Sequence, residues 1–395
     1  MLTKILLTMS HCSIPSSALL LLLFTVAFAS GQVPEGTQPV STNIRPDDCP
    51  CLFPDGRVLF RIEALDADNI QIDLGGKQYD MQPDSAGRWT VTTDPQEPGF
   101  HYYSLVIDSV KVADPASETY YGMGRMASGI DIPEAGVDFY TLKEVPHGDI
   151  RAHSYFSRTA EAWRNINVYT PPGYDDDPEK SYPILYIQHG GGEDERGWAV
   201  QGKTNVILDN LIASGKAVPM IVAIPNGNAT KPGVDARGYN DEAMAIFREE
   251  LFENVIPFVE ERYRVTSGAQ HRALAGLSMG GGQTFFTGLR HPEMFGSLGI
   301  FSTGLFGGIG RPEGEVFDPE TIIPGILTHP EPFNDQLDLL YISVGQQDPR
   351  IEATQKLVET FRREGLDVEF ASFPGGHEWQ VWRKSLHDFA PRLFR

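Results

Sequence analysis

The sequence predicts two folded parts, a small all-β sandwich followed by a larger doubly wound, mostly parallel α/β sheet. Three observations predict this arrangement. The chain has 395 residues, more than one core comfortably holds. Residues 52–120 contain short runs with apolar side chains at alternate positions, separated by turn residues. From residue 145 to 395, short and continuously apolar runs alternate with amphipathic helical runs.

Residues 1–29 predict a secretory signal peptide. Lys4 precedes an apolar block over 18–29 that ends in Ala-Phe-Ala, a pattern typical of a cleavage site. The alternative is a membrane anchor, but about twelve residues fall short of the roughly twenty that span a bilayer. We therefore expect a secreted or periplasmic protein that has no membrane partner after cleavage.

Charge and cysteine content narrow the class of protein. The formal net charge is −21, and loss of Lys4 with the signal makes it one unit more negative. Such an acidic protein is not expected to bind nucleic acid or an anionic membrane surface. Cys12 leaves with the signal, and Cys49 and Cys51 stand too close in sequence to bridge each other easily. We expect no disulfide to hold this fold.

Residues 30–51, rich in Pro, Thr, Ser and Asp, are expected to be a linker. The sandwich follows over 52–120, with expected strands at 58–62, 70–74, 88–92 and 102–107. The motifs Gly-Arg-Trp at 87–89, Pro-Gly-Phe-His-Tyr at 98–102 and Val-Lys-Val-Ala-Asp-Pro at 110–115 resemble family 48 carbohydrate-binding modules, which are immunoglobulin-like. The aromatic side chains Trp89, Tyr102 and Tyr103 could stack on sugar rings, or Trp89 and Tyr102 could simply be core residues.

A second linker is expected over 121–144, and the α/β part over 145–395. Its expected strands are residues 184–187, 220–224, 273–277, 339–344 and 368–373. Its expected helices are residues 205–213, 246–263 and 354–363, the second kinked at Pro257.

The sequence Gly-Leu-Ser-Met-Gly at 276–280, between an apolar run and a helical run, predicts a nucleophile elbow. This G-x-S-x-G pattern places Ser278 on a tight turn from strand to helix, with its hydroxyl exposed above the sheet. A chain this rich in Gly and Ser should show roughly 0.2 such matches by chance, so the pentapeptide alone is a weak signal and its partners have to carry the interpretation.

A serine hydroxyl needs a base, and the base needs an acid that orients it. Asp348 follows the 339–344 strand and His377 follows the 368–373 strand, in the order serine, acid, histidine of α/β-hydrolases. Asp348 could instead be a helix cap before Pro349, and His377 an ordinary loop histidine.

Negative charge on a substrate oxygen needs backbone N–H donors that are already in place. We expect one from Met279, directly after the nucleophile, and one from Gly191, in the His-Gly-Gly-Gly run at 189–192 after the first α/β strand. A glycine run can also be a turn with no other role.

These motifs give residues 145–395 a family resemblance. Together with Val-Tyr-Thr-Pro-Pro-Gly-Tyr at 168–174, Ile-Pro-Asn-Gly at 224–227 and Gly-Gly-His at 375–377, they resemble the putative-esterase family. Its members include feruloyl and acetylxylan esterases of carbohydrate esterase family 1, enterochelin esterases and formylglutathione hydrolases. The resemblance implies the α/β-hydrolase fold, a triad of Ser278, Asp348 and His377, and oxyanion donors at Met279 and Gly191.

The function that we expect is a secreted serine carboxylesterase that removes feruloyl or acetyl groups from plant cell-wall polysaccharide such as arabinoxylan. The alternatives are an enterochelin esterase, a secreted acyltransferase of the same fold and a carbohydrate-binding protein without activity. Trp198, Trp379 and Phe306 could stack on a feruloyl ring or pack in the core. No cofactor and no metal are expected, because no H-E-x-x-H or C-x-x-C spacing occurs. The oligomeric state is not predicted.

Overall fold

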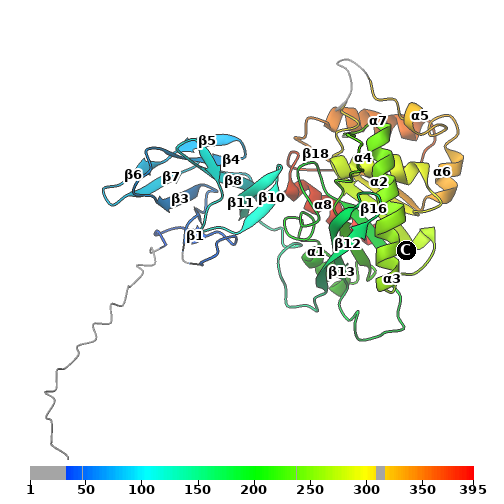
Figure 1. Ribbon diagram of the computed structural model, residues 1–395, viewed down its shortest axis with the longest axis horizontal. Coiled ribbons are helices and arrows are strands. Elements are labelled where there is room, and N and C mark those ends of the chain that lie inside the picture. The colour runs from blue at the N-terminus through cyan, green and yellow to red at the C-terminus, as the bar shows by residue number, and fades with distance from the viewer. Residues whose placement is uncertain (1–32, 47, 237, 308–315) are drawn as a thin grey trace, which may run out of the picture.

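The computed structural model describes residues 33–46, 48–236, 238–307 and 316–395, and these form an all-β part and an α/β part (Figure 1). The predicted signal peptide, 1–29, lies outside the described residues. Among the described helices, none is both long and apolar enough to cross a membrane.

Two antiparallel sheets face each other in the all-β part. The first has the strand order β1-β2-β3-β7-β6, and the second has the order β10-β11-β8-β4-β5, with β9 also paired to β8. The strands are β1 (Gln38–Pro39), β2 (Cys51–Leu52), β3 (Val58–Glu63), β4 (Ile70–Leu74), β5 (Lys77–Asp80), β6 (Gln82–Pro83), β7 (Arg88–Thr92), β8 (Gly99–Ile107), β9 (Val110–Val112), β10 (Thr119–Gly122) and β11 (Arg125–Ile132). Inward side chains of both sheets make the core, as the alternation predicts.

The two aromatic neighbours on β8 point to opposite faces of their sheet. Tyr103 is buried in the sandwich core with Phe60 and Trp89. Tyr102 instead packs against the core of the α/β part. The core position suggested for Trp89 therefore agrees with the structure, whereas Tyr102 belongs to the contact between the two parts.

Residues expected to be linkers contribute strands. β11 pairs with β8 along Gly99–Tyr103 and extends the second sheet, although its residues were assigned to the linker 121–144. The segment 30–51 likewise supplies β1 and the start of β2. Both stretches are rich in Gly, Ser or Pro, which lowers their strand propensity, and pairing with neighbouring strands overrides that preference.

The α/β part is built on an eight-stranded sheet of order β12-β13-β15-β14-β16-β17-β18-β19. Its strands are β12 (Asp149–Ser157), β13 (Ala162–Thr170), β14 (Ile184–Gln188), β15 (Ile221–Pro225), β16 (Arg272–Leu277), β17 (Ser297–Phe301), β18 (Leu339–Gly345) and β19 (Glu369–Phe373). The pairs β12–β13 and β13–β15 are antiparallel, and the remaining neighbours are parallel. Every residue of β14 to β16 except Arg272 is buried, which matches the continuous apolar runs.

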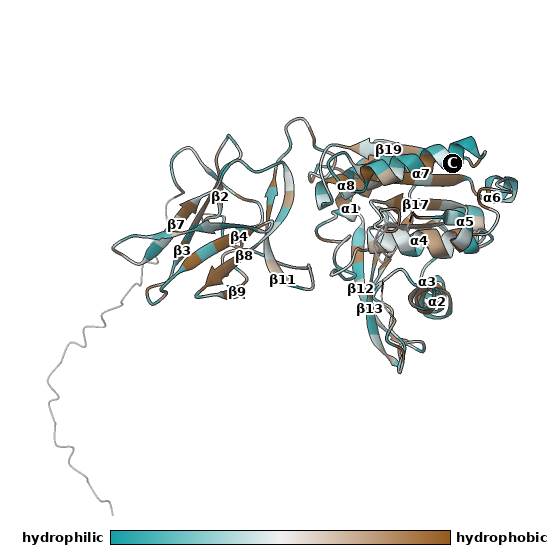
Figure 2. Ribbon diagram, turned by 90° about the horizontal axis from the view of Figure 1, so that it is seen from above, coloured by the Kyte–Doolittle hydropathy of each residue, from teal (hydrophilic) through white to brown (hydrophobic). Residues whose placement is uncertain are grey.

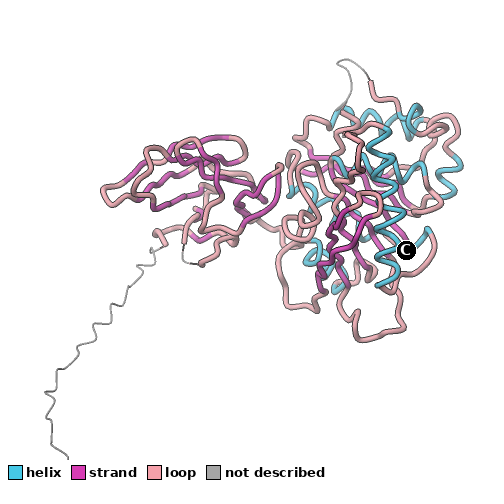
Figure 3. Tube along the Cα trace, in the orientation of Figure 1, coloured by secondary structure: helices cyan, strands magenta, loops and turns pink. Residues whose placement is uncertain are grey.

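Helices cover both faces of this sheet, with strands in the middle (Figure 3). The helices are α1 (Thr204–Ala213), α2 (Asp241–Glu250), α3 (Ile256–Arg262), α4 (Met279–Arg290), α5 (Pro319–Ile322), α6 (Glu331–Gln336), α7 (Ile351–Arg363) and α8 (Trp379–Phe389). Buried side chains of α2, α3, α4 and α7 share one core cluster, and those of α1 and α8 share the other. The hydropathy colours show hydrophobic residues concentrated on the strands between these layers (Figure 2).

The long helix expected over 246–263 is interrupted before Pro257. Residues Leu251–Val255 form a π-helical turn that joins α2 to α3. Proline has no N–H to donate and its ring crowds the preceding turn, so a widened turn at this place relieves the conflict.

Buried polar contacts fasten the sandwich to α8. Arg383 is fully buried, and its Nη1 lies 3.0 Å from Oδ1 of Asp131 on β11. Lys203 reaches the other oxygen of Asp131 at 2.7 Å, and Lys384 pairs with Glu134 at 2.8 Å. Because α8 begins two residues after His377, the sandwich braces the segment that carries the predicted base.

Candidate active site

The backbone at Ser278 has the strained geometry of a nucleophile elbow. Ser278 lies between β16 and α4 with φ 51° and ψ −110°, a conformation that costs a non-glycine residue free energy. Its N–H donates to the carbonyl of Phe301 at 2.8 Å, which ties the turn to β17. A Cβ added to Gly276 would lie 2.4 Å from the carbonyl carbon of Gly280, so glycine is required where strand and helix cross.

The three residues of the predicted triad form one chain of hydrogen bonds. His377 Nε2 lies 3.0 Å from Ser278 Oγ, and His377 Nδ1 lies 2.8 Å from Asp348 Oδ2. Ser278 is half-buried, the His377 side chain is 25% exposed and Asp348 is 1% exposed. The acid is thus shielded from water while the hydroxyl and the imidazole stay accessible to a substrate.

Asp348 is held as a carboxylate by three donors. Besides His377, the backbone N–H of Arg350 reaches Oδ1 at 3.0 Å and its Nη1 reaches the same oxygen at 2.9 Å. Burial works to raise the pKa of this carboxyl, but the hydrogen bonds from His377 and Arg350 outweigh it and the pKa is lowered. The residue that caps the following helix α7 is Arg350, so Asp348 does not stand at the helix-cap position.

A pocket of about 210 Å³ opens at the hydroxyl of Ser278. Gly191 and His377 line it, so a carbonyl bound there meets both the nucleophile and the loop with the predicted oxyanion donor. Met279, the other predicted donor, follows Ser278 directly as the first residue of α4, and it lines a separate pocket of about 420 Å³.

The sandwich supplies part of the wall of the smaller pocket. Phe100 and Tyr102 come from β8, and Met123 comes from the turn between β10 and β11. Trp379 and Trp382 on α8 complete the aromatic lining. Sequence reasoning did not identify the pocket-lining role of Phe100, Tyr102 and Met123, because this role depends on packing between segments that are far apart in the sequence.

Of the three predicted stacking residues, only Trp379 lines this pocket. Trp198 is fully buried, donates from Nε1 to the Gln188 carbonyl at 2.9 Å and packs against Trp379. Phe306 is 4% exposed and packs against Phe285. Trp198 and Phe306 thus occupy the core position that the sequence left open as the alternative, and Trp379, although only 2% exposed, lines the pocket.

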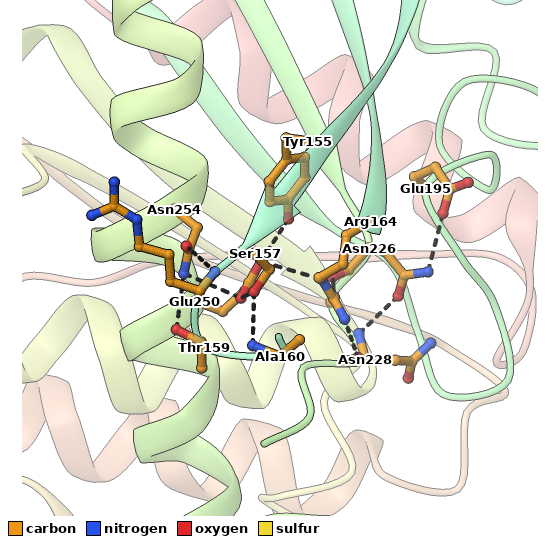
Figure 4. A network of polar contacts seen from close by, with 12 residues as sticks. Tyr155, Ser157, Thr159, Ala160, Arg164, Glu195, Asn226, Asn228, Glu250 and Asn254 are labelled. Atoms are coloured by element: carbon orange, nitrogen blue, oxygen red, sulfur yellow. Dashed lines mark hydrogen bonds and ion pairs between the residues drawn. The ribbon is translucent and has the colours of Figure 1, made fainter. Parts of the chain in front are cut away.

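A network of buried polar side chains contacts the loop that follows β14 and contains the glycine run 190–192 (Figure 4). The Glu250 carboxylate accepts hydrogen bonds from the hydroxyls of Tyr155 and Ser157. Its Oε1 lies 3.2 Å from Nε of Arg164. Arg164 donates to the carbonyls of Asn226 and Asn228 at 2.5 and 3.0 Å.

The amides of those two asparagines continue the network into the loop. Asn226 donates to Glu195 Oε2 at 3.1 Å, and Asn228 donates to the Glu193 carbonyl at 2.8 Å. In the same region the Gly227 N–H donates to His189 Nε2 at 2.9 Å. The glycine run is therefore anchored by a network of hydrogen bonds.

No cluster of three or more His, Cys, Asp or Glu side chains suited to a metal ion occurs within the described part of the chain. Cys49 and Cys51 are both buried and unbridged.

Comparison with protein families and curated proteins places the chain among esterases. A family model described as "Putative esterase" matches residues 157–393. An endo-1,4-beta-xylanase/feruloyl esterase of Xylanibacter ruminicola is 36% identical over 384 residues, 94% of this chain and 49% of that protein. The chain thus spans about half the length of this relative.

Solved structures show the same fold. A carbohydrate esterase family 1 ferulic acid esterase of Anaeromyces mucronatus matches with a TM-score of 0.54 and 25% identity over 65% of this chain and 95% of that chain. An enterochelin esterase of Shigella flexneri matches with a TM-score of 0.61 over 86% of this chain and 92% of that one, at 16% identity. The latter likeness concerns the fold alone. The predicted α/β-hydrolase fold is confirmed.

Proposed function

The chain belongs to the Putative esterase family, and we propose that it is a secreted serine carboxylesterase that cleaves feruloyl or acetyl esters of plant cell-wall polysaccharide. The observation that carries the proposal is the hydrogen-bond chain from Ser278 through His377 to Asp348, set on a strained elbow. The relative that is named a xylanase/feruloyl esterase supports the choice of ester.

The proposed reaction is a two-step acyl transfer. His377 Nε2 accepts the proton of Ser278 Oγ while that oxygen attacks the ester carbonyl. Asp348 keeps the His377 proton on Nδ1 and stabilises the imidazolium that forms. The sugar leaves as an alcohol after taking the proton from Nε2. Water then attacks the acyl carbon while it gives a proton to the same nitrogen, and His377 returns that proton to Ser278 Oγ as the bond to the acyl group breaks and the carboxylic acid leaves.

The oxyanion of each tetrahedral intermediate needs donors on the side of the carbonyl away from the imidazole. We propose the N–H groups of Gly191 and Met279 for this role, since Gly191 lines the pocket at Ser278 and Met279 follows the nucleophile directly at the start of α4. Donors of this kind lower the barrier by about 2.7–4 kcal/mol each.

The β-sandwich is proposed to be a carbohydrate-binding-module-like domain that runs to Ile132, with the α/β-hydrolase domain after residue 145. Its contact through Asp131 and Arg383 keeps any glycan that it binds near the catalytic pocket. Retention of the isolated Ser278→Ala protein on immobilised arabinoxylan, compared with an unsubstituted matrix, tests the binding role.

A substrate panel of methyl ferulate, acetylated xylan and enterochelin tests the choice of ester. We expect release of ferulate or acetate from the plant-derived esters and loss of that activity in Ser278→Ala. Preference for enterochelin would overturn the substrate proposal, and acylated sugar in place of free acid would identify an acyltransferase. Activity in Ser278→Ala equal to that of the wild type would overturn the triad.

A further inference from the structure

Both neighbours of Gly191 in the oxyanion loop are fixed by hydrogen bonds. The Gly190 N–H donates to Glu193 Oε2 at 3.2 Å, and the Gly190 carbonyl accepts from the Glu193 N–H at 3.3 Å. On the other side, the Gly192 carbonyl accepts from the N–H of Gly124 in the sandwich at 2.8 Å. The direction of the peptide between them depends on these two attachments.

The phenol of Tyr102 has one possible acceptor for its proton among its three close partners. Gln201 Nε2 lies 2.8 Å and Trp379 Nε1 lies 3.2 Å from the Tyr102 oxygen, and both groups are donors. Glu193 Oε1 lies 3.3 Å from the same oxygen. The hydroxyl proton of Tyr102 therefore points to Glu193, so that each carboxyl oxygen of Glu193 accepts one hydrogen bond.

This arrangement makes the charge state of Glu193 matter. Glu193 is 5% exposed, and burial raises its pKa to about 7 although Gly190, Tyr102 and Trp379 act in the opposite direction by hydrogen bonding. The nearby charge of Asp194 acts in the same direction as burial. The other titratable groups around it are Tyr102 on β8 and, across the shared pocket, His377 and Glu378. A proton on Oε2 interferes with the hydrogen bond from the Gly190 N–H, and a proton on Oε1 interferes with the hydrogen bond from Tyr102.

We propose that Glu193 is a positioning residue whose carboxylate ties Gly190 of the oxyanion loop to Tyr102 of the sandwich and so aims the Gly191 N–H into the pocket beside Ser278. The proposal rests on the proposed function, because it assigns a support to the same acyl-transfer site. The all-β part thus helps to position the oxyanion loop through the hydroxyl of Tyr102, in addition to any glycan that it binds.

Steady-state hydrolysis of 4-nitrophenyl acetate tests this role in Glu193→Gln, Tyr102→Phe and the double variant. The amide of Glu193→Gln keeps the size of the side chain but offers one acceptor in place of two. We expect kcat to fall about 10- to 100-fold with KM nearly unchanged, less than the roughly 10²–10³ lost with a whole oxyanion donor. The double variant should lose little more than Glu193→Gln alone.

Tyr103→Phe is the matched control. It also removes a tyrosine hydroxyl next along β8, one that donates to Asp114 at 2.8 Å inside the sandwich. We expect its kcat to equal that of the wild type. In addition, kcat measured as a function of pH should fall on the acid side more steeply in the wild type than the loss of a single proton-binding group predicts. In Glu193→Gln the same fall should fit a single ionisation.

Unchanged kcat and an unchanged acid limb in Glu193→Gln would overturn the proposal, as would additive losses in the double variant. Amide hydrogen exchange gives a readout that needs no activity: residues 189–193 should exchange faster in Glu193→Gln than in Tyr103→Phe. Equal exchange would also overturn it. If the wild type hydrolyses no ester, the proposed function fails, and the exchange result still decides on Glu193.

Discussion

Replacing Asp348 by asparagine should reverse the tautomer of His377. Asp348 Oδ1 already accepts two hydrogen bonds from Arg350, at 3.0 Å from its backbone N–H and 2.9 Å from Nη1. In Asp348→Asn the new carbonyl oxygen must stay on that side, because both Arg350 groups are donors. The new NH₂ group then faces His377 Nδ1, which has to become an acceptor. His377 Nε2 carries the proton and cannot take one from Ser278.

The expected loss is about 10⁴-fold in kcat, or about 5 kcal/mol of transition-state stabilisation. The assay is hydrolysis of an aryl ester near neutral pH, with thermal unfolding to establish that the variant is folded. Asp367→Asn, which makes the same change at an exposed position, is the control and should keep wild-type activity. A loss of less than tenfold in Asp348→Asn would refute the argument that Asp348 sets the His377 tautomer.

Three further predictions concern stability. Gly276→Ala places a methyl group against the backbone of α4 and should lower the free energy of unfolding by at least about 1–3 kcal/mol. Its control, Gly191→Ala, has no atom within 4 Å of the new Cβ and should unfold like the wild type. The pKa of Glu193 is raised to about 7, so the folded state binds its proton more tightly than the unfolded state and stability should fall as pH rises from about 4.5 to about 7. Denaturant titrations across that window should give a flatter profile for Glu193→Gln, and an identical profile would contradict the shift. Arg383→Met leaves the buried carboxylate of Asp131 with Lys203 as its remaining cation and should lower the free energy of unfolding by about 1.5–3 kcal/mol in denaturant titrations. A cost under about 1 kcal/mol would mean that this pair does not fasten the sandwich.

The site could be predicted where local pattern decides geometry. The elbow around Ser278 needs glycines at fixed positions, and the order of strand ends placed Asp348 and His377 on the same edge as the serine. The first constraint acts over a few residues, and the second follows because the carboxyl ends of parallel strands lie at the same edge of a sheet. The structure brings these three side chains within hydrogen-bonding distance.

The support of the site could not be predicted in the same way. Glu193 stands in a Glu-Asp-Glu run, a composition typical of a solvated loop. Only the structure shows that its side chain is buried and lies within hydrogen-bonding distance of Tyr102. Alternation along β8 places Tyr102 and Tyr103 on opposite faces but does not say which face meets the core. The strand β11 could not be predicted because its first half, Arg-Met-Ala-Ser-Gly, lacks the alternation of apolar and polar residues and depends on pairing with neighbouring strands.

The central claim, that Ser278 is the nucleophile of an acyl transfer, is tested most directly by quenching the enzyme with acid during turnover of methyl ferulate and measuring the mass of its peptides. The account predicts a feruloyl group on the peptide that contains Ser278, and neither adduct nor turnover in Ser278→Ala. A feruloyl group on another residue, or wild-type turnover by Ser278→Ala, would contradict it.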